Sequence, residues 1–224
     1  MNINVVYLLF FNILFIITLQ IGELLYKRLK LAPEITRKLL HTSGALMCLM
    51  FPKYFTDQIY VLILGIEFLL VFLASKYFGF YQSVNNVKRK TYGSYFFPVA
   101  IYAAFLFASY IGNWTVFYLA VLLLAISDPM AFFVGYFLKK KKSGSPKTFG
   151  SGGKTFYGSL SFFLSAFIIS LLVLPHNQMG IATLLLVAFA VSSTTTFTEA
   201  VSTYGTDNIT IPVVAIAVLV LFNL

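Results

Sequence analysis

Residues 127–159 read S-D-P-M-A-F-F-V-G-Y-F-L-K-K-K-K-S-G-S-P-K-T-F-G-S-G-G-K-T-F-Y-G-S. The stretch places the carboxylate of Asp128 in an apolar run, follows it with the small residues Ala131 and Gly135, and then continues into a segment with six lysines. An ionisable side chain inside a membrane span is costly when unpaired, so it indicates a functional site. The alternative for Asp128 is pairing with a nearby lysine for packing. Close helix approach is explanation enough for Ala131 and Gly135.

The rest of the chain has the composition of a membrane protein. Hydrophobic residues make up 59% of the 224 positions and charged residues only 10%, whereas soluble domains carry about 25% charged residues. The apolar residues fall in blocks of about 15 to 22, a length that crosses a hydrocarbon core of roughly 30 Å. These blocks lack the alternation of barrel strands. We therefore expect an all-α polytopic membrane bundle, a single domain over 1–224, with 1–30 peripheral to a catalytic core at 31–224.

Eight apolar blocks are candidate spans. They lie at about 3–25, 39–51, 57–75, 94–111, 114–138, 155–174, 179–197 and 209–223. The second block is short enough to be re-entrant or half buried, so the sequence predicts seven or eight transmembrane helices.

Basic residues occupy alternate connections, which predicts the orientation. Lysines and arginines are retained on the cytoplasmic side of membranes, and they gather in the first, third and fifth connections. With eight spans, both termini lie outside and these loops face the cytoplasm, in a cell inner membrane or the endoplasmic reticulum. The net charge of +9 then suits anionic lipid headgroups and not nucleic acid. The seventh connection breaks the pattern because it carries Glu199 and Asp207 but no lysine.

Three copies of a Lys-Thr-aromatic pattern suggest phosphate binding. They begin at Lys90, Lys147 and Lys154, and two of them directly precede a span. A helix N-terminus has unpaired N–H groups, so a neighbouring lysine and hydroxyls would form a phosphate cradle. Ordinary helix capping and charge retention are the alternative. A P-loop is excluded because Thr148 stands where that motif needs its first glycine.

Two further groups complete the expected site. Arg37 and His41 share a helix face, with Lys38 close by, and bind phosphate or simply form an interfacial helix that meets lipid. Asp128, Glu199 and Asp207 are hard oxygen ligands that would hold Mg²⁺ together with substrate phosphates.

These residues together resemble the CTP-dependent membrane lipid kinases, a family of dolichol kinase, phytol kinase and the yeast-type diacylglycerol kinase that is related to phosphatidate cytidylyltransferases. The resemblance rests on R-K-L-L-H-T-S-G from Arg37, Y-G-S-Y-F-F-P from Tyr92, S-D-P-M-A-F-F-V-G from Ser127, S-P-K-T with K-T-F-Y-G-S, and Y-G-T-D-N-I-T-I-P from Tyr204. Many relatives have a glutamate where this chain has Tyr157, so Glu199 or Asp207 would have to serve instead.

The resemblance implies transfer of the γ-phosphoryl group of CTP to a membrane lipid alcohol, namely a polyprenol, a phytol-like alcohol or diacylglycerol. It implies essential roles for Asp128 and Lys154, and we expect a catalytic role for Asp207 as well. Either Lys147 or Lys154 could be the family lysine, and alignment with Gly158-Ser159 favours Lys154. The expected nucleotide- and phosphate-binding residues are Arg37, Lys38, His41, Lys90, Ser145, Lys147, Thr148, Lys154, Thr155, Gly158, Ser159 and Asn208.

Two other functions remain open at this point. A cytidylyltransferase would use the same metal and lysines but release pyrophosphate. A transporter would also explain an intramembrane carboxylate, although the polar residues gather at one face. The sequence leaves open which alcohol or nucleotide is used and whether the chain forms a homo-oligomer.

Overall fold

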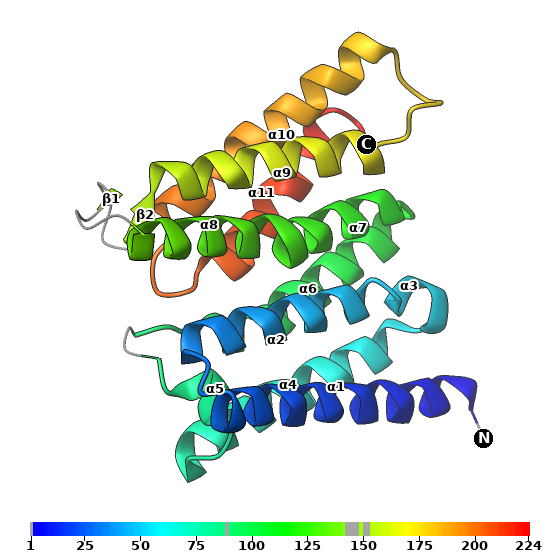
Figure 1. Cartoon of the computed structure of the whole chain (residues 1–224). Coiled ribbons are helices and arrows are strands. Elements are labelled where there is room, and N and C mark those ends of the chain that lie inside the picture. Colours follow the sequence, from blue (N-terminus) through cyan, green and yellow to red (C-terminus); the bar gives the residue numbers. More distant parts are fainter. Residues whose placement is uncertain (1, 88–89, 142–147, 150–152) are drawn as a thin grey trace.

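The computed structural model describes residues 2–87, 90–141, 148–149 and 153–224, with only the backbone described for 139–141 and 148–149. Helices dominate it (Figure 1). In chain order they are α1 (Ile3–Arg28), α2 (Pro33–Cys48), α3 (Phe51–Tyr54), α4 (Gln58–Phe78), α5 (Gln82–Asn85), α6 (Gly93–Ile111), α7 (Trp114–Leu122), the π-helix η1 (Leu123–Ser127), α8 (Asp128–Lys141), α9 (Phe156–Val173), α10 (Ile181–Val201) and α11 (Asp207–Leu221). The two-residue strands β1 (Thr148–Phe149) and β2 (Lys154–Thr155) pair antiparallel. The predicted all-α bundle is confirmed.

Six helical segments in the described part are long and apolar enough to cross a membrane. They are Ile3–Arg28, Gln58–Phe78, Gly93–Ile111, Trp114–Leu138, Phe156–Val173 and Ile181–Val201. The remaining predicted spans, 39–51 and 209–223, correspond to α2 and α11, which have 16 and 15 residues. At 1.5 Å per residue these helices extend about 24 Å, less than a typical hydrocarbon core of roughly 30 Å. The count of seven or eight spans and the orientation therefore stay predictions.

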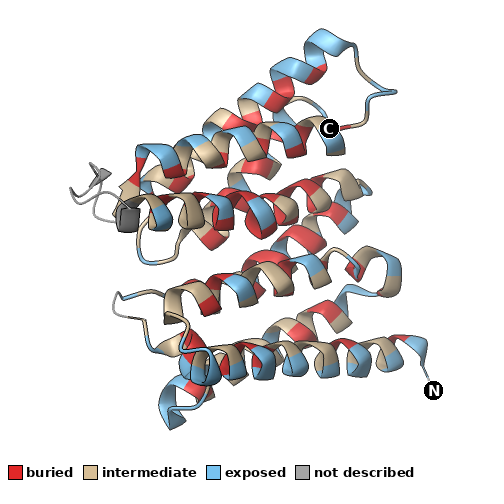
Figure 2. Ribbon diagram, in the orientation of Figure 1, coloured by how far each residue is buried: buried red, intermediate tan, exposed pale blue. Residues whose placement is uncertain are grey.

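The core has two apolar clusters, and α7 contributes to both. Val116 and Leu119 pack with η1, α8, α9, α10 and α11, whereas Phe117 and Val121 pack with α1, α2, α3, α4 and α6. A helix that is apolar all round is expected where every face is covered. Figure 2 shows the resulting concentration of buried residues along the central helices. The helix that leads to Asp128 is thus held in the middle of the bundle.

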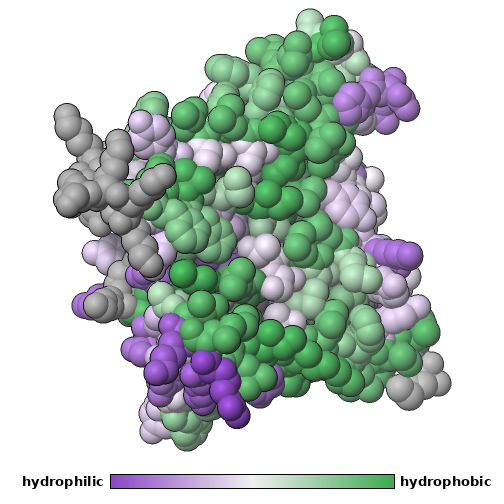
Figure 3. Space-filling view, in the orientation of Figure 1, coloured by the Kyte–Doolittle hydropathy of each residue, from purple (hydrophilic) through white to green (hydrophobic). Residues whose placement is uncertain are grey.

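The outer helices present apolar side chains to their surroundings. On α1, Ile13 is 61% exposed and Ile21 is 51% exposed, and similar residues cover α4, α9 and α10. Figure 3 shows this apolar surface along the bundle, with hydrophilic groups gathered mainly toward its ends. Soluble monomers rarely expose apolar patches of this extent, so the surface supports an integral membrane protein.

The polar connections meet at one end of the bundle. The start of α2, α5, β1, β2 and the connection from α10 to α11 lie there, opposite the N-terminus, α3 and the C-terminus (Figure 1). This is the arrangement expected when the odd-numbered connections lie on one side. We call this end the polar end.

Candidate functional site

Asp128 begins α8 and is only 2% exposed. Its carboxylate forms an ion pair with Lys38 of α2, also buried, and lies 3.5 Å from Nε2 of His41. The pairing predicted as the alternative for Asp128 is therefore present, but its lysine comes from a distant helix and not from the adjoining loop. A buried pair of this kind is costly to break, because removing either partner leaves the charge of the other uncompensated.

A π-helical turn positions Asp128 and leaves a carbonyl that His41 binds. Hydrogen bonds in a π-helix join a carbonyl to the N–H five residues later, and the N–H of Asp128 accordingly donates to the carbonyl of Leu123. The next carbonyl, that of Leu124, would need the nitrogen of Pro129, which carries no hydrogen. Nε2 of His41 lies 3.1 Å from this carbonyl oxygen, and since a carbonyl only accepts, Nε2 donates. Pi-helical turns often occur at functional sites.

Lys154 forms a second charged cluster with two carboxylates. It comes from β2, binds the carboxylate of Glu199 near the end of α10, and lies 3.2 Å from Oδ2 of Asp207, the first residue of α11. Glu199 is 2% exposed, and its Oε2 has no hydrogen-bond partner among the residues that the structure describes. A buried carboxylate oxygen without a partner is unusual and calls for a further donor or a cation as its partner.

The acids around Lys154 keep it charged. Burial lowers the pKa of Lys154, but the carboxylates of Asp207, Glu199 and Asp128 outweigh that effect and raise the pKa above its ordinary value. The ammonium group therefore stays protonated throughout the physiological pH range.

The starts of α6 and α11 fix the position of Asp207. The N–H of Tyr92 donates to the carbonyl of Tyr204 at 2.8 Å, and Nδ2 of Asn208 donates to the carbonyl of Gly93 at 2.7 Å. Gly205 has φ +86°, and a Cβ there would lie 2.5 Å from the backbone nitrogen of Gly93. Only glycine fits such a close approach of two backbones.

The first turn of α9 packs closely on α8. The Oγ1 of Thr155 caps the helix by accepting from the N–H of Gly158 at 3.1 Å. A Cβ on Gly158 would lie 2.9 Å from the carbonyl oxygen of Ala131, and one on Gly135 would lie 3.0 Å from Thr155 Oγ1. The close helix approach predicted at Gly135 is confirmed, Ala131 takes part in it through its backbone carbonyl, and the capping by Thr155 is present.

Both charged clusters line one cavity of about 640 Å³ at the polar end. Among the described residues, two lysines and four acids contribute to its wall; they are Lys38, Lys154, Glu34, Asp128, Glu199 and Asp207. The other described residues of the wall are Ala131, Phe132, Gly135, Tyr136, Gly153, Thr155, Gly158 and Ser159. The structure thus brings together all three predicted catalytic residues, Asp128, Lys154 and Asp207.

Other predicted phosphate-binding residues lie elsewhere or have other partners. Arg37 donates from Nη1 to Thr91 Oγ1 at 3.0 Å, and it lines a second, mostly apolar cavity together with His41 and Asn208. Lys90 is exposed and lines neither cavity. Ser145 and Lys147 lie outside the described residues, and the side chain of Thr148 does too, so the choice between Lys147 and Lys154 stays open.

The predicted metal ligands converge only in part. No group of three His, Cys, Asp or Glu residues that could hold a metal ion occurs in the described part of the chain. Asp128 forms an ion pair with Lys38, whereas Glu199 and Asp207 both pair with Lys154. These two carboxylates, with the unsatisfied oxygen of Glu199, fit a Mg²⁺ ion that is otherwise held by phosphate oxygens.

Sequence reasoning missed several residues of the cavity wall. Phe132 and Tyr136 follow Asp128 by four and eight positions, so helical periodicity places them on the face of α8 that carries Asp128. Their spacing was therefore sufficient to find them. Glu34 could have been found in the same way, since it lies one turn before Lys38 on α2.

Comparison with known proteins adds no relative. No protein-family model, no curated protein and no solved structure matches the chain.

Proposed function

We propose that the chain is a Mg²⁺-dependent membrane kinase that transfers the γ-phosphoryl group of CTP to the hydroxyl of a lipid alcohol. The observation that carries this proposal is the cavity at the polar end, where Lys38 and Lys154 lie beside Asp128, Glu199 and Asp207. Phosphoryl transfer depends on positioning and on neutralising charge, so it needs lysines and metal-binding acids in one site. The choice of CTP rests on the family resemblance of the motifs.

The charge of the cavity supports a role for a divalent cation. Four acids, Glu34, Asp128, Glu199 and Asp207, lie among the described residues of its wall. A triphosphate is itself strongly negative, and a divalent cation bound between it and these acids would offset their mutual repulsion. Mg²⁺, when bound, would offset phosphate charge, and Glu199 and Asp207 are the residues that would hold it.

Each side chain of the cavity would have its own role in phosphoryl transfer. Lys154 at the start of α9 would hold phosphate oxygens, supported by Ser159, whose Oγ has no partner in the described part of the structure. Asp207 would accept the proton of the attacking hydroxyl. The alcohol oxygen would bond to the γ-phosphorus while the bond to the β-phosphate oxygen breaks, giving lipid phosphate and CDP. Lys38 and His41 would hold Asp128 in place.

Product analysis tests the proposal. Purified protein in nanodiscs would be given γ-labelled CTP, Mg²⁺ and a panel of prenols, phytol and diacylglycerol. We expect labelled lipid phosphate and CDP, and we expect the Asp128→Asn variant to form neither. The matched control is Asp57→Asn, which alters an N-cap of α4 at the opposite end and keeps an acceptor for the N–H of Ile59.

Three outcomes would contradict the proposal. Absence of lipid phosphate with every alcohol would exclude a lipid kinase that uses CTP, and the same panel with ATP would show whether only the donor is wrong. Release of pyrophosphate with phosphatidate would identify a cytidylyltransferase. Substrate flux into liposomes without CTP would favour a transporter.

A further inference from the structure

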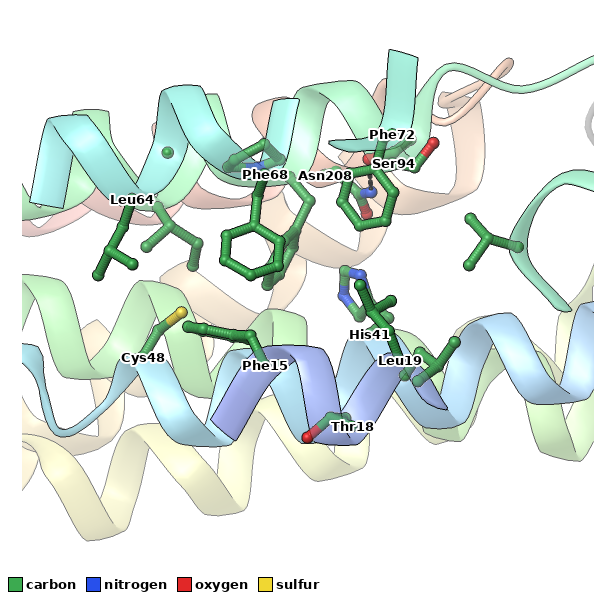
Figure 4. Close-up of a pocket in the computed structure, with 18 of the residues that line it drawn as sticks. Phe15, Thr18, Leu19, His41, Cys48, Leu64, Phe68, Phe72, Ser94 and Asn208 are labelled. Carbon is green, nitrogen blue, oxygen red and sulfur yellow. Dashed lines mark hydrogen bonds between the residues drawn. The ribbon is translucent and has the colours of Figure 1, made fainter. Parts of the chain in front are cut away.

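The second cavity lies between α1, α2, α4 and α6 and is mostly apolar. Its volume is about 110 Å³. Figure 4 shows Leu64 and Phe68 of α4 facing Phe15 of α1 and Cys48 of α2 across this space. We call it the apolar cavity. Because α1 and α4 are outer helices of the bundle, its walls lie where the apolar part of a membrane lipid resides.

The apolar cavity ends in polar groups. His41, Ser94 and Asn208 lie toward one end of it, whereas Leu64 and Cys48 lie toward the other (Figure 4). Asp207 is the one carboxylate among its described lining residues. A molecule with a long apolar part and one hydroxyl matches this order of surfaces.

The two cavities adjoin at the reacting groups. Lys38 and Asp207 line both the apolar cavity and the cavity at the polar end. A hydroxyl at the polar limit of the apolar cavity would therefore meet Asp207 on one side and a phosphate held by Lys154 on the other. This juxtaposition supplies the arrangement of acceptor and donor that the transfer requires.

We propose that the apolar cavity binds the hydroxyl-proximal chain of a single-chain lipid alcohol, such as a prenol, and selects against diacylglycerol. The inference rests on the proposed function. Size carries the selection, because apolar cavities of roughly 150 Å³ bind one benzene-sized group. A cavity of 110 Å³ accommodates one chain segment beside the hydroxyl and has no space for the two acyl chains of diacylglycerol.

Photolabelling tests occupancy without needing turnover. A farnesol analogue with a diazirine in its isoprenoid chain would be irradiated with the full-length protein in nanodiscs and the labelled peptides mapped by mass spectrometry. We expect label on the walls around Phe15, Cys48 and Leu64, reduced by excess farnesol and unaffected by diacylglycerol. Label confined to the lipid-facing surface, or displaced equally by diacylglycerol, would overturn the inference.

Filling the cavity gives a second readout. Gly65 lines the apolar cavity, and a Cβ there would lie 3.7 Å from the carbonyl oxygen of Pro98, an ordinary contact, so Gly65→Leu adds volume at the cavity wall. We expect it to raise the KM for farnesol by about tenfold, an effect typical of a pocket altered by a few carbons, while the KM for CTP is unchanged. The matched control is Ile66→Phe, which adds volume to the next residue of α4, an exposed position.

The two readouts separate the inference from the proposed function. Competed labelling of the apolar cavity without any lipid phosphate would contradict the kinase and support the chain site. Phosphorylation of farnesol at the same KM by wild type and Gly65→Leu, or equal turnover of diacylglycerol, would support the kinase and overturn the inference.

Discussion

Nζ of Lys154 lies 3.2 Å from Oδ2 of Asp207 and also binds the carboxylate of Glu199. The lysine precedes α9, and the two acids end α10 and begin α11. One ammonium group thus links three segments of the chain at the wall of the cavity at the polar end. A bound phosphate would compete with these two acids for the lysine.

Removing this ammonium group should remove transfer. We expect Lys154→Met to lower kcat by about 10²–10³-fold, the usual cost of deleting one group that stabilises transition-state charge. Lys154→Arg should retain part of the activity because it keeps the charge but not the compact geometry. Labelled-CTP assays on protein with an unchanged elution volume measure this, with Lys53→Met at the opposite end as the control. Wild-type turnover in Lys154→Met would shift the role to Lys147.

The ion pair of Asp128 with Lys38 allows structure and activity to be separated. Lys38→Met alone leaves a buried carboxylate uncompensated and should destabilise the protein by about 3–5 kcal/mol. The double variant Lys38→Met with Asp128→Asn should recover most of that loss, since no charge is left unpaired. Thermal unfolding in detergent measures this recovery.

In the same double variant we expect stability to recover but activity to stay lost. If Asp128 and Lys38 serve only packing, the recovered fold would restore phosphoryl transfer. We expect turnover to remain at background. Recovery of both properties together would confine the pair to a structural role.

The π-helical turn predicts a rescue of another kind. His41→Phe leaves the carbonyl of Leu124 without its donor, and an unsatisfied buried carbonyl costs about 1–3 kcal/mol. Adding Pro129→Ala restores a backbone N–H that can donate within the helix, so part of the lost stability should return. Thermal unfolding of the single and double variants measures the difference. Equal stability of His41→Phe and wild type would show that this hydrogen bond contributes nothing.

The contact between Gly93 and Gly205 should tolerate no side chain. At Gly205 an alanine would combine a strained φ of +86° with a Cβ 2.5 Å from the nitrogen of Gly93, so the start of α11 and Asp207 would be displaced. We expect Gly205→Ala to abolish transfer and to lower the unfolding temperature. Gly180→Ala, where a Cβ meets nothing within 4 Å, should leave both unchanged.

The fold class and much of the site could be predicted from the sequence, for physical reasons. Apolar blocks of membrane length that lack the alternation of barrel strands form helices. The alternation of basic and non-basic connections then predicted that Asp128, Lys154 and Asp207 lie at one end of the bundle. The partner of Asp128 could not be predicted, because Lys38 lies 90 positions away and no local pattern says which helices are neighbours. The separate apolar cavity escaped prediction for the same reason, since helices far apart in the sequence, from α1 to α11, build it.

Metal dependence distinguishes a Mg²⁺ site formed by Glu199 and Asp207 from one that includes Asp128. Glu199 and Asp207 converge on Lys154, whereas Asp128 is held by Lys38. Glu199→Gln should therefore raise the Mg²⁺ concentration for half-maximal transfer by at least about tenfold, the scale on which altering a group around a metal changes its affinity. Gln keeps an oxygen for Lys154, so the fold should persist. Glu67→Gln, which alters the acceptor for Nδ2 of Asn12 on α1, is the matched control. Titration of Mg²⁺ after treatment with a chelator measures the shift. An unchanged Mg²⁺ requirement in Glu199→Gln, with an increase in a residually active Asp128 variant, would return the metal to Asp128.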